Sequence, residues 1–315
     1  QMSSFIKNNI LVSVIIPCYN VQDYIENCIE SVFNQIYKPI EIICVDNNSN
    51  DKTYSILSKF ESESKIKVYK CFDKGANYAR NLGIIKSKGN WIQFLDADDI
   101  LLPEKIELQV REILKNTNID VIFSPHIKRS MENTDTIISC NEIVELGLLS
   151  TKLGITSSNL FKSSKLNSCG MWDVNQNSSQ EYELMFRMYK KKAIFKYSRN
   201  NMTIIQSRKA GQISTLNLKE NWERYIDLRL EMLKFFNKES RLIILENQNH
   251  INQLLFDLIR ILYKFNQLKA LAIYSKYLQN FSPQKSESTG YLYIIIFNIF
   301  GFSITEKIRR RLHFD

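Results

Sequence analysis

The first 125 residues alternate between two hydrophobic periods. Short apolar, largely β-branched runs predict buried strands at 12–16, 41–45, 66–69, 91–95 and 121–123. Between them, apolar residues recur at steps of three and four and predict helices over 25–36, 52–60, 77–86 and 103–114. Strands that alternate with helices predict an α/β protein with a doubly wound, mainly parallel sheet. Ligands bind such sheets outside the carboxyl ends of the strands, a rule that directs attention to Asp46 and to Asp96–Asp99.

The rest of the chain has a different pattern. Residues 127–211 are less regular and rich in Ser and Asn, with one clear helix predicted over 180–190. From about residue 221 the pattern is wholly helical, and a second long helix is predicted over 242–265. We therefore expect a boundary near residue 217 and a helical C-terminal appendage over 218–315.

Composition narrows the class of protein. The chain has 44% hydrophobic and 24% charged residues, which is ordinary for a globular protein. The net charge is +9, with basic residues scattered except for a cluster at Lys307–Arg311. Because no basic stripe with aromatics runs along the chain, we expect no nucleic-acid partner. The six cysteines include no Cys-x-x-Cys pair and are expected to be reduced, and no signal peptide or stretch of about 20 apolar residues is apparent. These features predict a cytoplasmic protein.

Three carboxylates follow the strand at 91–95, in Asp96-Ala97-Asp98-Asp99. They fit two interpretations. Acids in this place favour the N-terminus of the helix that begins near Pro103. They also suit Mg²⁺ or Mn²⁺, which are commonly held by one or two carboxylates while substrate phosphates complete the shell. A nucleotide diphosphate is a ligand of the second kind.

Four motifs in order resemble glycosyltransferase family 2, whose enzymes have a GT-A fold. They are Ser13–Asn20, which contains Pro-Cys-Tyr-Asn, then Val45–Thr53, Lys74–Gly83 and Phe94–Asp99, which contains Asp-Ala-Asp. The resemblance weakens toward Ser214 and ends there. It implies a catalytic domain over 1–217, with a nucleotide-binding half at about 11–124 and an acceptor half at about 125–217.

The resemblance also implies roles for single residues on the donor side. Pro17 and Tyr19 would line the nucleoside pocket, and Asp46 would contact the base or ribose. Arg80 would lie near the base, ribose or phosphate. Asp96 would approach the ribose or metal-bound water, and Asp98 would be the principal ligand of Mn²⁺ or Mg²⁺. The family often has two acids after its second strand, whereas Asn47 follows Asp46 here. A UDP-sugar is the favoured donor, but this departure leaves the nucleotide open.

Acceptor-side residues are expected near the predicted helix at 180–190. Ser178–Arg187 resembles the segment that carries the family's Glu-Asp pair, with Gln180-Glu181 in its place, so Glu181 would be the general base. Ser178-x-x-Glu181 also fits a helix capping box, which is the structural alternative. His126 is expected to be a loop histidine without a catalytic role.

Three further residues are candidates for substrate contact. Trp172 and Asp173 stand where the family often has an aromatic residue followed by Asp. Trp172 either stacks on an acceptor sugar or belongs to the core. Arg208 lies in a segment that resembles the loop over the diphosphate, and its guanidinium suits bidentate phosphate binding.

The C-terminal region ends in a twelve-residue apolar stretch, Tyr291–Phe302, followed by the basic cluster Lys307–Arg311. Such a combination suits the interface of an anionic membrane, so residues 291–311 are a candidate peripheral attachment. The alternative is a helix packed on the protein or on a second subunit.

Taken together, the residues and the resemblance predict an inverting, metal-dependent glycosyltransferase. It would move a sugar from a nucleotide-diphosphate-sugar to a hydroxyl of a surface polysaccharide or lipid-linked glycan. A dinucleotide dehydrogenase would need Gly-x-Gly-x-x-Gly after the first strand, but the residues that follow this strand, 17–22, include no glycine. The P-loop motif of nucleoside-triphosphate-binding enzymes is missing as well. A catalytically degenerate scaffold protein of a glycan-assembly complex is the alternative, and the oligomeric state is left open.

Overall fold

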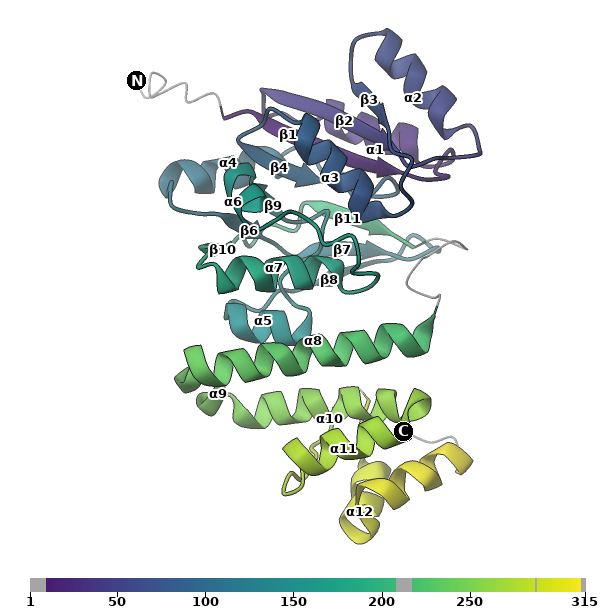
Figure 1. Ribbon diagram of the computed structural model, residues 1–315, viewed down its shortest axis with the longest axis vertical. Helices are drawn as coiled ribbons and strands as arrows, with labels where there is room; N and C mark the ends of the chain where they lie inside the picture. The colour runs from purple at the N-terminus through teal and green to yellow at the C-terminus, as the bar shows by residue number, and fades with distance from the viewer. Residues whose placement is uncertain (1–9, 208–216, 287, 313–315) are drawn as a thin grey trace. The chain divides into compact units, whose positions relative to one another are not determined.

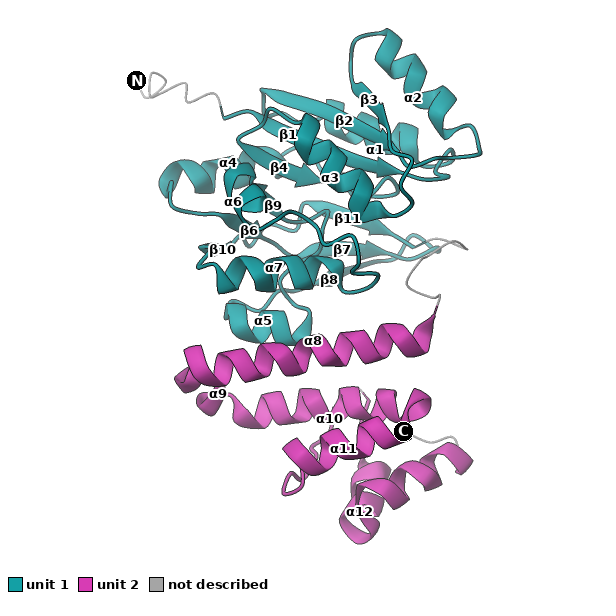
Figure 2. Cartoon of the chain, in the orientation of Figure 1, with its two compact units in different colours: residues 1–211 teal, residues 212–315 magenta. Residues whose placement is uncertain are grey.

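The structure is a computed structural model that describes residues 10–207, 217–286 and 288–312. The chain divides into two compact units, 1–211 and 212–315 (Figure 2). Unit 1 contains both helices and strands, and the described part of unit 2 is helical.

The strands of unit 1 are β1 (Val12–Cys18), β2 (Ile40–Asp46), β3 (Lys67–Lys70), β4 (Trp91–Phe94), β5 (Ile100–Leu101), β6 (Val121–Phe123), β7 (His126–Arg129), β8 (Asp135–Ile138), β9 (Leu160–Lys162), β10 (Phe195–Tyr197) and β11 (Thr203–Gln206). Its helices are α1 (Ile25–Phe33), α2 (Thr53–Ser62), α3 (Ala76–Lys86), α4 (Lys105–Lys115), α5 (Val144–Ser150), α6 (Ser163–Ser168) and α7 (Gln180–Lys190).

Seven of the strands form one sheet in the order β10-β6-β9-β4-β1-β2-β3 (Figure 1). The pairs β1–β2, β1–β4, β2–β3 and β6–β10 are parallel, whereas β9 runs antiparallel to both of its neighbours. The prediction of a mainly parallel sheet is therefore confirmed. Because β1 lies between β2 and β4, the loops that follow these three strands share one edge of the sheet.

Helices cover both faces of this sheet. On one face, alternate residues of β1 belong to the same buried cluster as apolar residues of α1, α2 and α4. On the other face α3 approaches β1 closely, since a Cβ at Gly83 would lie 2.3 Å from the Cγ2 of Ile15. Burial on both sides explains why β1 reads as a nearly continuous apolar run rather than as an alternating one.

A second sheet of four strands has the order β5-β11-β7-β8. Strand β11 pairs parallel with β7 and antiparallel with β5, and β7 pairs antiparallel with β8. The sequence did not predict this sheet, because its strands are short and β8 is largely exposed. It adjoins the acidic turn, since β5 begins directly after Asp99.

Unit 2 consists of α8 (Leu218–Glu239), α9 (Arg241–Glu246), α10 (Gln248–Phe265), α11 (Gln267–Tyr277) and α12 (Tyr291–Leu312). The helix predicted over 242–265 is in fact two, because the chain leaves the helical conformation at Asn247. Helix α12 is also two helical segments, which meet at Gly301 with φ 69° and ψ 178°.

The core of unit 2 is aromatic and contains a buried ionic group. The ring of Phe256 contacts the rings of Phe281, Tyr293, Phe297 and Phe302 at centroid distances of 5.5–6.0 Å. Nearby, the fully buried carboxylate of Glu306 accepts bonds from Arg260 Nε at 3.1 Å and from Arg309 Nη2 at 2.7 Å. Arg309 is thus a structural residue of the core rather than part of an exposed basic cluster.

The apolar stretch at 291–302 was expected to be too short to cross a membrane. In the structure it continues as a helix to Leu312, and this 22-residue helix is long and apolar enough by length and composition alone. Only 28% of its most apolar window is buried. The bend at Gly301 divides the helix near its middle.

Candidate active site

The candidate donor residues follow three neighbouring strands of the large sheet. Cys18 at the end of β1 pairs with Asp46 at the end of β2, and Ile15 of β1 pairs with Phe94 at the end of β4. The turn that contains Asp96 and Asp98 follows β4 directly. Strand pairing thus brings together segments that are far apart in the sequence.

Asp46 is the last residue of β2 and is 4% exposed. Its Oδ1 has no hydrogen-bond partner among the described residues. A buried carboxylate oxygen without a donor is unfavourable by about 1–3 kcal/mol. A ligand N–H or O–H that entered from the edge of the sheet would satisfy it.

Asn47 holds a neighbouring loop in place. Its Nδ2 donates to the carbonyl oxygens of Cys71 at 3.1 Å and Asp73 at 2.6 Å, and its Oδ1 accepts from the backbone N–H of Gly75 at 2.9 Å. All three partners belong to the segment between β3 and α3. The amide that departs from the family's usual acid therefore fixes the chain just before α3, which carries Arg80.

Two residues at the end of β1 border the same edge. Pro17 is half-buried within β1, and Tyr19, which follows it, is 55% exposed. Tyr19 is the residue after Cys18, which pairs with Asp46. An exposed aromatic ring and a buried carboxylate that lacks a donor are groups that suit a nucleoside, since a base can stack on the first and donate to the second.

Arg80 links three segments of unit 1. Its Nη2 lies 2.9 Å from Asp96 Oδ1, and its Nη1 donates to Gln180 Oε1 and Asn77 Oδ1, each at 3.0 Å. The guanidinium lies 4.7 Å from the ring centre of Trp172. Because Arg80 is buried and Gln180 opens α7, this group fixes the position of the acidic turn relative to the start of α7.

The three acids of the turn have different surroundings. Asp99 is buried, and its Oδ2 accepts a bond of 2.5 Å from Ser157 Oγ. Burial, together with the charges of Asp96 and Asp98, raises the pKa of Asp99 well above its ordinary value. Ser157 Oγ also accepts from the backbone N–H of Asp96 at 3.0 Å. Asp99 and Ser157 therefore shape the turn.

Asp96 and Asp98, unlike Asp99, are only half-buried. Among the residues that the structure describes, no group of three or more His, Cys, Asp or Glu side chains is placed to hold a metal ion. A site with one or two carboxylates fits Mg²⁺ or Mn²⁺ that takes its other ligands from a diphosphate and water. It does not fit a metal held by protein ligands alone.

Glu181 is the second residue of α7. The helix begins at Gln180, and its N-cap is Ser179, which makes no capping bond through its side chain. Counted from this N-cap, Glu181 stands at the second helical position, whereas a capping box has its acid at the third. Glu181 directly follows Gln180, which accepts a hydrogen bond from Arg80, and Arg80 also pairs with Asp96.

Trp172 was a candidate for acceptor stacking, and the structure corrects this. The ring is 2% exposed and packs edge-on against Phe94 at 5.2 Å. No face is open to a sugar, so the alternative of a core tryptophan is the right one. Asp173 is partly exposed and accepts the backbone N–H of Asn175 at 2.9 Å in a local turn.

Arg208 lies outside the described residues. Nearby, Gln206 at the end of β11 donates through Nε2 to the carbonyl oxygen of Asp98 at 2.9 Å. A hollow of about 260 Å³ beside it is lined by Tyr24, Arg129, Ser130, Met131, Asn133, Gln206 and Ser207. The second sheet thus reaches the acidic turn directly.

Sequence reasoning missed the amides that hold the acceptor-side loop. The Nδ2 of Asn81 donates to the backbone carbonyl oxygen of Trp172 at 2.8 Å, and its Oδ1 accepts from the backbone N–H of Trp172 at 3.0 Å. Asn77 donates to the carbonyl oxygen of Asp173 at 2.7 Å. Their spacing of four residues on one helix face was the available signal, because two amides on a helix that packs on a sheet need partners.

His126 is buried at the start of β7, and burial lowers its pKa to about 4. It is therefore neutral and part of a strand, where a loop histidine was expected.

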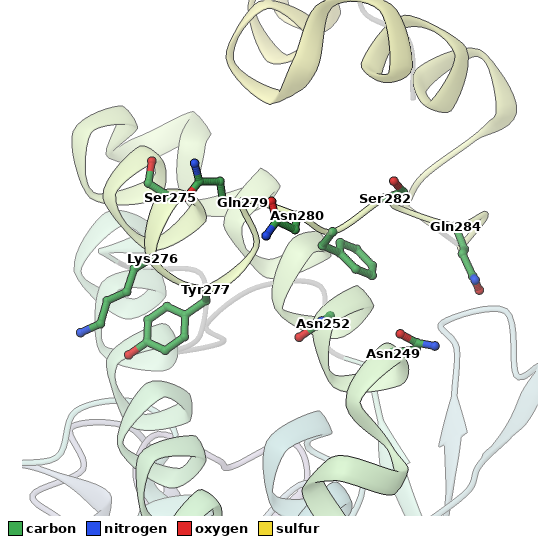
Figure 3. A pocket seen from close by; sticks show the side chains of 10 residues that line it. Asn249, Asn252, Ser275, Lys276, Tyr277, Gln279, Asn280, Ser282 and Gln284 are labelled. Atoms are coloured by element: carbon green, nitrogen blue, oxygen red, sulfur yellow. The ribbon is translucent and has the colours of Figure 1, made fainter.

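A separate hollow of about 530 Å³ lies within unit 2 (Figure 3). Its described lining includes the carboxamides Asn249, Asn252, Gln279, Asn280 and Gln284 and one ionic side chain, that of Lys276. Among the residues that the structure describes, no carboxylate lines it that could hold a metal or act as a base. The chemistry expected of this protein therefore belongs to the edge of the large sheet in unit 1.

A mainly parallel α/β sheet with an acidic turn and an unsatisfied carboxylate at its carboxyl edge is typical of α/β domains that bind a ligand at that edge. Comparison with known proteins gives the family. The model of glycosyl transferase family 2 matches residues 13–205. The chain therefore belongs to glycosyltransferase family 2 and is a glycosyltransferase.

Two curated relatives have only a general description. The uncharacterized glycosyltransferase RP339 of Rickettsia prowazekii is 29% identical over 277 residues, which cover 82% of each chain. RT0329 of Rickettsia typhi, also described as an uncharacterized glycosyltransferase, is 30% identical over 251 residues, 74% of this chain and 75% of that one.

A third relative has a more specific name. It is the UDP-Glc:alpha-D-GlcNAc-diphosphoundecaprenol beta-1,3-glucosyltransferase WfaP of Escherichia coli. The identity is 42% over 100 residues, which cover 32% of this chain and 40% of WfaP.

The fold has a solved counterpart. S. aureus TarS, residues 1–349, in complex with UDP-GlcNAc has a TM-score of 0.61 and 16% sequence identity, over 95% of this chain and 91% of that one. At this identity the likeness establishes the GT-A fold.

Proposed function

We propose that this protein transfers a sugar with inversion, from a nucleotide-diphosphate-sugar to a hydroxyl, with the help of Mn²⁺ or Mg²⁺. The observation that carries the proposal is the convergence at one sheet edge. There Asp46 has an unsatisfied buried oxygen, Arg80 is paired with Asp96, and Asp98 belongs to the same turn as Asp96.

The donor nucleoside binds between Tyr19 and Asp46, with Pro17 as part of the wall. Asp46 Oδ1 accepts a hydrogen bond from the base or ribose. We favour a UDP-sugar, because TarS was solved with UDP-GlcNAc and the name of WfaP specifies UDP-Glc. The loop held by Asn47 borders the same pocket.

Asp98, with Asp96, would hold the divalent ion, which neutralises negative charge on the leaving diphosphate. Arg80 keeps Asp96 in position, and Arg208 is the candidate for a further phosphate contact. Glu181 takes the proton of the acceptor hydroxyl. The hydroxyl oxygen then forms the new bond to the anomeric carbon as the bond to the diphosphate breaks, which inverts the configuration. Asp173 is the candidate for acceptor contact.

The acceptor is a glycan, and we favour a lipid-linked one because the name of WfaP specifies a diphosphoundecaprenol-linked substrate. A protein with such an acceptor works at a membrane. We propose a cytoplasmic protein attached peripherally to the inner face of the cell membrane through residues 291–311.

The test is a thermal-shift screen of nucleotide diphosphates and their sugars, with and without Mn²⁺. A true donor at one hundred times its dissociation constant stabilises the folded protein by about 2.7 kcal/mol. Transfer to lipid-linked acceptors follows, with the anomeric configuration of the product read by NMR. Retention would refute the direct displacement. Donor binding without turnover on any acceptor would favour the scaffold alternative.

A further inference from the structure

The first segment of α12 has two apolar faces. Tyr293 and Phe297 point into the core of unit 2, where both contact Phe256. Leu292, Ile295 and Ile299, at steps of three and four, form another face and are 53–68% exposed. A helix that uses one apolar face for its own core needs no second one for folding. A contiguous exposed apolar face of this kind marks an interaction surface.

The second segment of α12 also has a buried face and an exposed face, and both carry charged residues. Its inward residues include the buried pair Glu306 and Arg309. Ile304, Lys307 and Arg311 are exposed at steps of three and four, and Arg310 is exposed beside them. Glu306 is the only acid of α12, and it is buried between two arginines. The exposed surface of α12 therefore carries positive charge only.

A further cation lies at the other end of the exposed apolar face. Lys285 Nζ lies 4.7 Å from the ring centre of Tyr291, whose side chain is 68% exposed. Exposed cations thus flank the apolar residues on both sides. Tyrosine and lysine beside apolar residues are typical of the headgroup level of a bilayer.

The geometry of α12 favours lying on a membrane over crossing it. The segment before Gly301 is roughly 15 Å long at 1.5 Å per residue, about half the thickness of a bilayer core. The segment after the bend is tied to α10 by Arg260, which bonds Glu306. The first segment is too short to span a bilayer, and the second cannot enter one without breaking this buried group.

We propose that the exposed face of α12 docks in the plane of an anionic phospholipid surface. Leu292, Ile295 and Ile299 enter the boundary between headgroups and acyl chains, and Lys285, Lys307, Arg310 and Arg311 contact lipid phosphates. This deepens the membrane attachment proposed above and rests on the proposed function only for that location. The attachment surface is then one face of the run 291–311 rather than the whole run, and Tyr293, Phe297 and Arg309 do not belong to that face.

The test is cosedimentation of the whole protein with phosphatidylcholine vesicles that contain 0% or about 30% phosphatidylglycerol. The wild type binds the anionic vesicles in preference. Ile295→Glu with Ile299→Glu lowers the partition coefficient by at least about tenfold, because two apolar side chains leave the interface. Neutralising Lys307, Arg310 and Arg311 to Gln lowers it by roughly fivefold per charge.

The matched control is Leu242→Glu with Leu268→Glu, two leucines of α9 and α11 that are 75% and 82% exposed. It adds the same charge to unit 2, and vesicle binding equal to that of the wild type is expected. Metal-dependent binding of UDP, measured by thermal shift, reports separately on unit 1. If the protein binds vesicles but not UDP, the proposed function is refuted and the membrane inference is not. Equal binding to both kinds of vesicle would overturn the inference. So would a dimer that dissociates in Ile295→Glu with Ile299→Glu while vesicle binding persists.

Discussion

Asn47 offers a direct test of how the candidate donor pocket is built. Family 2 enzymes often carry a second acid at this position, so Asn47→Asp would restore the commoner pattern. The structure predicts that the change is harmful here. The Nδ2 of Asn47 donates to two carbonyl oxygens, those of Cys71 and Asp73. An ionised carboxylate would place an acceptor oxygen against both of them.

The size of the effect follows from the bonds that are lost. Two hydrogen bonds contribute about 1 kcal/mol each, and an unsatisfied group at this buried position adds about 1–3 kcal/mol. The bond from the N–H of Gly75 to the remaining side-chain oxygen is kept. We therefore expect Asn47→Asp to lower the free energy of unfolding at pH 7.5 by about 3–5 kcal/mol.

The pH dependence distinguishes this cause from a general packing defect. In the Asn47→Asp variant a protonated carboxyl group can still donate one bond, so the site favours the neutral acid and raises its pKa in the folded state. Between the unfolded value of about 3.9 and this raised value, the unfolded state binds fewer protons, so stability falls as pH rises. The loss should accordingly shrink between pH 7.5 and pH 4.5.

The assay is urea unfolding at both pH values, with Asn48→Asp as the control. Asn48 is adjacent and exposed, and it has the left-handed backbone that Asp tolerates. The control adds the same charge outside the hydrogen-bonded site and should change stability by less than about 0.5 kcal/mol. If Asn47→Asp were as stable as Asn48→Asp at pH 7.5, the role given to Asn47 would be refuted.

Three other predictions concern single side chains of unit 1. Asp98→Ala should abolish Mn²⁺-supported donor binding in calorimetry, and unchanged affinity would remove Asp98 from the metal site. Glu181→Gln should keep donor binding and lower transfer by about two to four orders of magnitude, while retained transfer would leave Glu181 without the role of base. His126 has a pKa near 4 when folded against an ordinary 6.5, so the unfolded state binds more protons between these values. The free energy of unfolding should fall by up to about 3 kcal/mol as pH drops from 6.5 to 4. His126→Asn should flatten this part of the pH profile, measured by urea unfolding. An unchanged profile would show that burial of His126 is not the cause.

The large sheet could be predicted from the sequence because each of its central strands is buried on both faces. Runs such as Val12–Ile16 and Val121–Phe123 contain little except apolar residues, and the helices between them have clear amphipathic spacing. The second sheet could not be predicted. Its order, β5-β11-β7-β8, depends on β11, whose Ile204 pairs with Ile100 of β5 and with Ile127 of β7, and strands of two to four residues leave too short a pattern.

The candidate site shows the same division. Asp46, Asp96 and Asp98 follow apolar strands, so their common edge follows from the fold class. The sequence could not show that Arg80 joins Asp96 to Gln180, since the three residues are separated by up to one hundred positions. Nor could it decide the environment of Trp172, because stacking on a sugar and packing in a core require the same residue type.

The basic cluster at the C-terminus explains why a charge pattern alone does not define a surface. Lys307, Arg309, Arg310 and Arg311 look equivalent in the sequence, yet Arg309 is buried on Glu306 and the other three are exposed. Helical spacing resolves the difference: Phe302, Thr305, Glu306 and Arg309 recur at three and four residues and are all buried. A carboxylate in the middle of an inward face requires inward cations. Arg309, three residues away, and Arg260 of α10 fill that need, because an unpaired buried charge would cost several kcal/mol. The remaining cations are then available to an external anionic partner, and the phospholipid proposal depends on these residues.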